Sequence, residues 1–117
     1  MLLFVYGTLK RGGENHRLLA GQRFVAEART VAEFKLYQLE GYPGLVPVFA
    51  GGNRIEGELW EVGPASLEEL DRFEGTDVGL FARRRIPLDR PHESESVEGY
   101  LYLGEIAGRR DLGSSFP

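Results

Sequence analysis

The sequence predicts an α+β domain built on a small, mixed-strand, barrel-like β-sheet with two short helices. Its 117 residues suit a single domain with one modest core. Sixteen glycines and six prolines divide the chain into short segments, several of them rich in aromatic and other strand-favouring residues. These strand-like segments follow one another without a helix between each pair, a pattern that does not fit a doubly wound parallel sheet.

The first half of the chain is expected to form one strand, one short helix and then further strands. Residues 2–6 are an apolar run that ends at Gly7, which is typical of a buried strand. Residues 14–20 are expected to form the short helix, which Gly21 ends. A turn sequence at residues 50–53 predicts that the strands on either side of it pair as a hairpin. The strands expected after the helix cover residues 24–32, 34–39, 45–49 and 54–62, with a turn at 41–44.

The second half contains the clearest helix signal, followed by two closing strands. Ser66 and Glu69 have the spacing of a capping box at the start of the helix, and apolar residues then recur on one helix face. Gly75 is expected to end the helix in a left-handed conformation. The closing strands are expected over residues 81–88 and 96–103.

We expect a single domain over residues 1–104 and a C-terminal tail over residues 105–117. The tail has weak periodicity and is expected to be partly disordered. No apolar run approaches the ~20 residues that a membrane helix needs, and the first residues lack the positive charge of a signal peptide. These features predict a cytoplasmic protein without a membrane partner, and they leave the oligomeric state open.

Charge and composition exclude several classes of ligand and of catalytic site. Acidic residues outnumber basic ones by 18 to 14, which argues against an electrostatic grip on nucleic acid. The chain has no cysteine, so disulfides, thiolate metal sites and cysteine nucleophiles are excluded. It has only two histidines, and we expect neither a metal nor a cofactor. If the protein is an enzyme, carboxylates, hydroxyls and main-chain groups must perform the reaction.

The first candidate site is the segment over residues 6–9, which ends a strand and begins a glycine-rich loop. Such a loop can present main-chain N–H groups to an anion. Gly7 and Gly12 have the spacing of a phosphate loop, but Gly13 and Glu14 stand where lysine and a hydroxyl residue would follow. The pattern therefore favours a carboxylate over a nucleotide. The alternative is an ordinary turn at the end of a strand, the more frequent role of short glycine motifs.

The second candidate is Glu74, in the last turn of the predicted helix. The negative end of the helix dipole and burial both raise the pKa of a carboxyl there, which suits a proton shuttle near neutral pH. The alternative is a solvated surface glutamate. Asp71 is expected to face solvent beside Arg72, and one arginine of residues 83–85 is a candidate partner for Glu74 or for a substrate carboxylate.

The chain carries four spaced motifs in a fixed order, and the resemblance that they support covers about residues 2–103. They are FVYGTLKRG at residues 4–12 with Asn15-His16 after it, GYPGLV at 41–46, GELWEV at 57–62 and LDRFEG at 70–75. With these motifs the chain resembles the gamma-glutamylcyclotransferase-like (AIG2-like) family, and it is most similar to the gamma-glutamylamine cyclotransferase branch. Several motifs in one order are far more specific than any single one.

The resemblance implies a compact α+β fold around a small mixed-strand barrel, with a cavity at one side. It implies that Tyr6, Gly7, Thr8 and Leu9 bind the substrate through main-chain contacts and that Glu74 is the catalytic acid and base. The implied reaction, of the transferase or lyase type, is attack of the substrate's α-amine on its own γ-carbonyl. The products are 5-oxoproline and a free amine, and no metal is needed.

Two positions depart from the family pattern. Phe81 stands where many relatives carry tyrosine, and residues 113–117 lack the usual acidic and aromatic ending. Both differences bear on the identity of the substrate more than on the type of reaction. The alternative function is a non-catalytic domain that binds a small carboxylate in the same cavity. The enzyme interpretation requires Glu74 to lie in the same cavity as the Gly7 loop.

Overall fold

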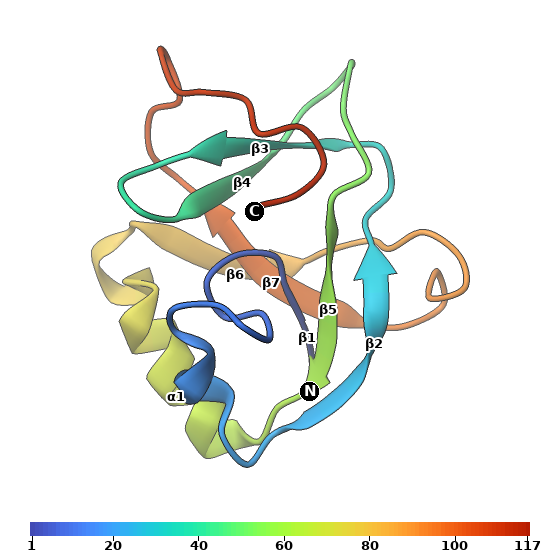
Figure 1. Cartoon of the computed structure of the whole chain (residues 1–117), viewed down its shortest axis with the longest axis vertical. Helices are drawn as coiled ribbons and strands as arrows, with labels where there is room; N and C mark the ends of the chain where they lie inside the picture. The colour runs from blue at the N-terminus through green and yellow to red at the C-terminus, as the bar shows by residue number, and fades with distance from the viewer.

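A computed structural model of residues 1–117 shows one curled seven-stranded sheet with an α-helix and two short 3-10 helices (Figure 1). This confirms the predicted α+β class and the mixed, barrel-like sheet. Of the two predicted helices, the first is only a 3-10 turn. The strands are β1 (Leu2–Val5), β2 (Arg23–Arg29), β3 (Phe34–Gln38), β4 (Pro43–Pro47), β5 (Glu56–Glu61), β6 (Phe81–Arg85) and β7 (Val97–Tyr102). The helices are η1 (His16–Leu19), α1 (Pro64–Phe73) and η2 (Thr76–Val78).

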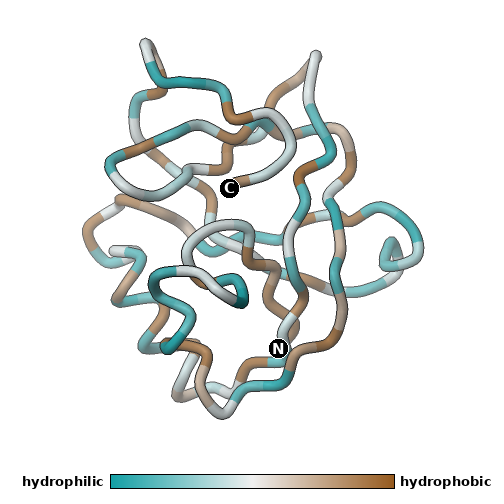
Figure 2. The backbone as a smooth tube through the Cα atoms, in the orientation of Figure 1, coloured by the Kyte–Doolittle hydropathy of each residue, from teal (hydrophilic) through white to brown (hydrophobic).

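Strand β1 is apolar on both faces because the sheet separates two core clusters. Side chains alternate along a strand, so each cluster receives every second residue. Leu3 and Val5 pack in the cluster that also holds Leu70 of α1. Phe4 and Tyr6 pack in the other cluster, which collects side chains from β3, β4, β5 and β7. Hydrophobic positions lie mainly in the strands, whereas the loop between β6 and β7 is strongly hydrophilic (Figure 2).

Strand β7 joins the two halves of the sheet, which has the order β2-β5-β1-β7-β4-β3. Strand β6 pairs antiparallel with one edge of β7 along most of its length. Strands β1 and β4 share the other edge, both parallel to β7. β1 is in register with Val97 and Glu98, whereas β4 is in register with Leu101. Gly99 and Tyr100 have no strand partner on this edge, and there β1 and β4 diverge.

Helix α1 begins three residues earlier than predicted. Gly63 is its N-cap and Pro64 its first residue, a position that suits proline because its missing N–H is not needed there. The predicted capping box of Ser66 and Glu69 is therefore wrong. The side chain of Gln22 instead accepts from the Gly63 N–H at 2.8 Å and donates to the Ser66 hydroxyl at 2.8 Å. The start of α1 is thus capped by Gln22, which is distant in the sequence, and not by the local pair of Ser66 and Glu69.

The predicted end of α1 is confirmed, because Gly75 follows it with φ of 68°.

The predicted hairpin of residues 45–49 and 54–62 is wrong. Strand β4 pairs with β3 and β7, whereas β5 pairs with β1 and β2. The turn at residues 50–53 does reverse the chain, but burial of β1 between β5 and β7 decides the pairing.

Residues 105–117, outside the domain expected from the sequence, lie against the sheet. The Leu112 N–H donates to the Leu36 carbonyl at 2.8 Å, and the Glu56 N–H donates to the Ser114 carbonyl at 2.8 Å. These bonds hold the tail beside β3 and at the first residue of β5, near the C-terminus (Figure 1). No helix of the chain has both the length and the apolar character needed to cross a membrane.

The attachment of α1 to the sheet can be tested with Leu70→Ala. Leu70 is the one fully buried side chain of this helix. Its truncation leaves a cavity between α1 and β1, so the free energy of unfolding is expected to fall by about 2–5 kcal/mol. Urea unfolding measures this. Leu67→Ala, at a partly buried position of the same helix, is the matched control and is expected to cost less. Equal losses for the two variants would contradict this packing.

Candidate active site

A cavity of about 360 Å³ opens where β1 and β4 diverge. Its volume falls in the range of small-molecule sites. The loop after β1, the loop before β4, the end of α1 and strand β7 all contribute to its wall. The residues that the sequence predicts as a site all line this one cavity, namely Tyr6, Gly7, Thr8, Leu9 and Glu74.

The loop after β1 is held in a tight conformation by its neighbours. A Cβ atom at Gly7 would lie 2.7 Å from Cγ of Pro43, closer than real contacts allow. Thr8 is buried, and Asn15 binds it twice. The Asn15 side chain donates to the Thr8 hydroxyl at 3.1 Å, and its N–H donates to the Thr8 carbonyl at 2.9 Å. Glycine at position 7 therefore allows the loop to lie directly on the first residue of β4.

Three successive N–H groups in this loop lack an acceptor. The N–H groups of Gly7, Thr8 and Leu9 donate to no atom of the protein. Thr8 and Leu9 are buried, and buried N–H groups are rarely left unpaired in folded proteins. Consecutive main-chain N–H groups form concave sites for anions. This part of the cavity wall is suited to hold a carboxylate or another negatively charged oxygen.

The far side of the loop is anchored by Glu58. Its carboxylate accepts from the Arg11 N–H at 3.0 Å, from Arg11 Nε at 3.1 Å and from Trp60 Nε1 at 3.1 Å. Burial acts to raise the pKa of Glu58, but these hydrogen bonds outweigh it and hold the pKa below its usual range. Glu58 therefore stays ionised and serves the loop as a structural group.

Glu74 occupies the opposite wall, at the C-terminal end of α1. Its N–H donates to the Leu70 carbonyl at 2.9 Å, which continues the helix pattern by one residue. No protein group donates a hydrogen bond to its carboxyl. Burial alone raises the pKa of Glu74 from 4.5 to about 7. At neutral pH this carboxyl can therefore both accept and release a proton.

Three tyrosines lie near Glu74 around the cavity. Burial is the largest cause that raises the pKa of Tyr6, Tyr42 and Tyr100, and the charge of Glu74 raises each further. The Tyr6 hydroxyl donates to the Tyr100 carbonyl at 2.6 Å. The Tyr100 hydroxyl donates to Oδ1 of Asp71 at 2.6 Å. The hydroxyl of Tyr42 has no protein partner, so it is free to contact a ligand.

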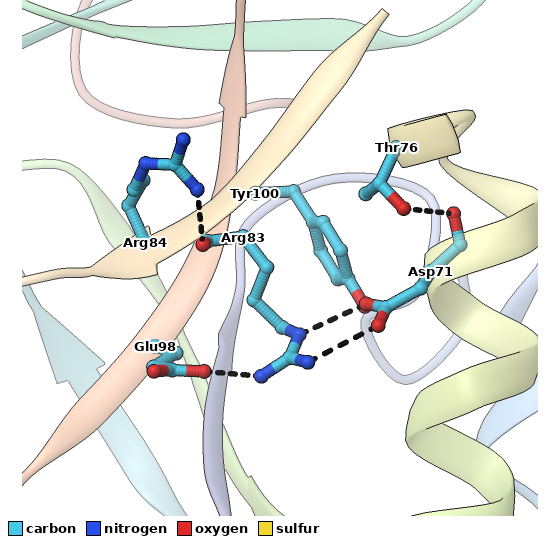
Figure 3. A network of polar contacts seen from close by, with 6 residues as sticks. All are labelled: Asp71, Thr76, Arg83, Arg84, Glu98 and Tyr100. Atoms are coloured by element: carbon cyan, nitrogen blue, oxygen red, sulfur yellow. Dashed lines mark hydrogen bonds and ion pairs between the residues drawn. The ribbon is translucent and has the colours of Figure 1, made fainter. Parts of the chain in front are cut away.

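Asp71 does not face solvent beside Arg72, so that prediction is wrong. Arg83 donates to both of its carboxylate oxygens, through Nε at 2.9 Å and Nη2 at 3.1 Å, and its third nitrogen pairs with Glu98 (Figure 3). The arginine that reaches α1 therefore binds Asp71 rather than Glu74. This fork connects the end of the helix to β6 and β7.

The charged residues that line the cavity are all acidic. They are Glu14, Glu40 and Glu74, and no lysine or arginine joins them. A carboxylate in this cavity therefore has to be held by main-chain N–H groups and hydroxyls. No group of three or more His, Cys, Asp or Glu side chains is placed to hold a metal ion.

Comparisons with known proteins agree with this architecture. Residues 3–114 match the family described as gamma-glutamyl cyclotransferase, AIG2-like. The chain is 39% identical to the human gamma-glutamylaminecyclotransferase over 117 residues, covering 86% of this chain and 76% of the human one. It is 33% identical to the Escherichia coli K12 gamma-glutamylcyclotransferase family protein YtfP, covering 97% and 93%. It superimposes on the crystal structure of c4763 from uropathogenic E. coli with a TM-score of 0.81 and 32% identity, covering 97% and 90%.

Replacement of Gly7 tests the fit between the loop and β4. Gly7→Ala places a methyl group against the Pro43 ring, so either the loop or the strand must move. We expect a loss of about 1–3 kcal/mol in the free energy of unfolding, measured by chemical denaturation. Gly63→Ala is the control, because the nearest atom lies 3.7 Å from its added Cβ and only the N-cap preference for glycine is lost there. A Gly7 variant that loses no more stability than this control would contradict the close contact.

The buried carboxyl of Glu74 predicts how stability depends on pH. The folded state holds the Glu74 proton more tightly than the unfolded chain, so the stability of the wild type falls as pH rises from 4.5 towards 7. Glu74→Gln cannot ionise and avoids this loss. Its stability advantage should be small at pH 5 and should grow by up to about 3 kcal/mol at pH 8. Thermal unfolding at both pH values measures this, and the same difference at both would contradict a buried carboxyl.

Proposed function

The chain belongs to the gamma-glutamyl cyclotransferase, AIG2-like family, and from this premise we propose that it converts a gamma-glutamyl amine or amide into 5-oxoproline and a free amine. Glu74 is the general acid and base of this reaction. The observation that carries the proposal is the placement of Glu74 and the three unpaired N–H groups of residues 7–9 around one cavity.

The substrate supplies its own nucleophile. The nitrogen of its α-amine attacks the γ-carbonyl carbon, and a new C–N bond closes a five-membered ring. The bond from this carbon to the leaving nitrogen then breaks, and the carbonyl re-forms in 5-oxoproline. Because both reacting groups belong to one molecule, holding it in a folded conformation removes much of the entropic barrier. The protein needs no nucleophile of its own.

Proton transfer is the part that the protein has to provide. The attacking amine must lose a proton as the ring closes, and the leaving nitrogen must gain one because it cannot depart as an amide anion. The ionised carboxyl of Glu74 takes the first proton and then donates it to the leaving nitrogen. A pKa of about 7 makes both steps accessible, and burial is the cause of that value.

The loop of residues 7–9 supplies the electrostatic part of the site. Its free N–H groups bind the substrate carboxylate or the oxygen that becomes negative during ring closure. No cation lines the cavity, so these main-chain donors are the principal positive groups available. The free Tyr42 hydroxyl provides a further contact on the side of Phe81, whose ring lies 6.1 Å from that of Tyr42.

A gamma-glutamyl amine is the favoured substrate class. The human relative is named a gamma-glutamylaminecyclotransferase, and the family resemblance in the LDRFEG motif includes the glutamate itself. The cavity wall around Glu74 includes the apolar side chains of Phe73, Leu80 and Phe81. These residues can accommodate the carbon chain of a leaving amine.

Release of 5-oxoproline from a panel of gamma-glutamyl compounds tests this function. Glu74→Gln is expected to lower kcat by about 10²–10⁴-fold, because the side chain can no longer accept a proton. In the wild type, kcat/KM should rise with pH through about 7 as Glu74 ionises. Glu69→Gln, an exposed glutamate of the same helix, is the matched control and should leave turnover unchanged.

The non-catalytic alternative makes a different prediction for the same panel. A domain that only binds small carboxylates would gain thermal stability with these compounds, by mass action, but would release no 5-oxoproline. That outcome would contradict the proposed enzyme. Full activity of Glu74→Gln would contradict the assigned role of Glu74 while leaving the activity itself in place.

A further inference from the structure

The carboxyl of Glu74 has no hydrogen-bond donor although three tyrosines line the same cavity. Each of these phenols could donate to a carboxylate. Tyr6 and Tyr100 instead direct their hydroxyl protons to other acceptors, the Tyr100 carbonyl and the Asp71 carboxylate. Tyr42 lies at the partly exposed side of the cavity and its hydroxyl has no partner. The local structure thus engages the hydroxyls of Tyr6 and Tyr100 elsewhere, and Asp71 is the acceptor that binds the Tyr100 proton.

Asp71 is well suited to bind this hydroxyl. Arg83 holds both of its oxygens, so its orientation is determined by two hydrogen bonds (Figure 3). Burial acts to raise the pKa of Asp71, but the bonds from Arg83 and Tyr100 outweigh it and keep the residue ionised. The side chains of Arg83 and Asp71 are 27% and 25% exposed, against 65% and 76% for the surface pair of Arg72 and Glu68 on the same helix. The partly buried pair of Arg83 and Asp71 is therefore less screened by solvent.

We propose that Asp71 is a positioning residue of the active site, which holds the Tyr100 hydroxyl away from Glu74 and fixes the end of α1 against β6 and β7. The inference rests on the proposed role of Glu74 and adds to it. Asp71 lies one helical turn before Glu74, and its contacts are the only polar side-chain bonds that join the last turn of α1 to the sheet. Asp71 is not among the residues that line the cavity, and it acts through Tyr100.

This arrangement has a chemical consequence for Glu74. A hydrogen bond donated to a carboxylate stabilises its ionised form and lowers its pKa. If Tyr100 were free to donate to Glu74, the carboxyl would hold its proton less tightly. It would then be a poorer base towards the attacking amine. Because Asp71 binds the Tyr100 hydroxyl, burial remains the dominant influence on the pKa of Glu74.

The other charged and titratable groups near Glu74 can be separated from this effect. Tyr6 directly follows β1, and Tyr42 directly precedes β4. Glu14 and Glu40 are exposed residues of the cavity wall. Solvent screens these two carboxylates. Arg83 carries the positive charge behind Asp71, and removal of Asp71 would leave it paired with Glu98 alone. A test must therefore separate the Tyr100 hydroxyl from the charge of Arg83.

Four variants make this separation, namely Asp71→Ala, Asp71→Asn, Tyr100→Phe and the double variant Asp71→Ala/Tyr100→Phe. The readouts are the pKa of Glu74 from ¹³C NMR of the carboxyl carbons, assigned by its absence in Glu74→Gln, and the pH profile of kcat/KM. Asp71→Ala should lower the pKa of Glu74 by about one unit and move the pH profile equally. Asp71→Asn keeps an acceptor oxygen and should restore most of the wild-type value.

The double variant distinguishes the two possible causes of a lower Glu74 pKa, the Tyr100 hydroxyl and the charge of Arg83. Without the Tyr100 hydroxyl, the pKa of Glu74 should return towards the wild-type value even though Asp71 is absent. A pKa that stays as low as in Asp71→Ala would assign the shift to Arg83 and overturn the proposal. An unchanged pKa in Asp71→Ala would overturn it as well.

Tyr100→Phe keeps the proposal testable if Asp71→Ala does not fold. In the wild type the Tyr100 hydroxyl does not donate to Glu74, so its removal should leave the pKa of Glu74 unchanged, and a shift would overturn the proposal. Glu68→Gln, which breaks the exposed pair on the same helix, is the control and should alter neither readout. The NMR titration needs no turnover, so failure of this inference is distinguishable from failure of the proposed activity.

Discussion

The shared edge of β7 is the constraint on which the rest of the structure depends. Two strands cannot pair with the same residues of one edge, so β1 and β4 must separate where their registers end. The cavity lies at this separation, as ligand sites often do where neighbouring strands diverge. At the divergence lies the buried Tyr100, with its carbonyl bound by Tyr6 and its hydroxyl bound by Asp71.

Burial, rather than a neighbouring charge, gives the site its acid–base character. The positive and negative groups near α1 are paired with one another, as Arg83 is with Asp71, or act on the loop, as Glu58 does with Arg11. Glu74 is left with apolar and phenolic neighbours, which penalise its charged form. The same environment that lowers the stability of the ionised state makes the carboxyl useful for proton transfer. With the role that we propose for Glu74, stability and activity are therefore opposed at this single residue.

Local motifs were enough to identify the groups to which we assign the reaction, but not those that we propose to position them. The glycine loop and the glutamate near a helix end each carry their chemistry within a few residues, and both lie in the cavity. The roles of Tyr100 and Arg83 depend on β6 and β7 lying beside α1, which no local spacing encodes. The hairpin error has the same origin, because residues 50–53 show that the chain reverses but not which strand it meets. The capping of α1 by Gln22 is a further long-range contact.

The order of the strands along the chain has a consequence for synthesis. The loop of residues 7–9 follows the first strand, but the edge against which its strand and β4 both pair comes from residues 97–102, near the C-terminus. Contacts between such distant segments form slowly because a long stretch of chain must be closed first. On the ribosome, the N-terminal loop would emerge long before its opposite wall exists. With the site that we propose, ligand recognition is thereby delayed until almost the whole polypeptide has been made.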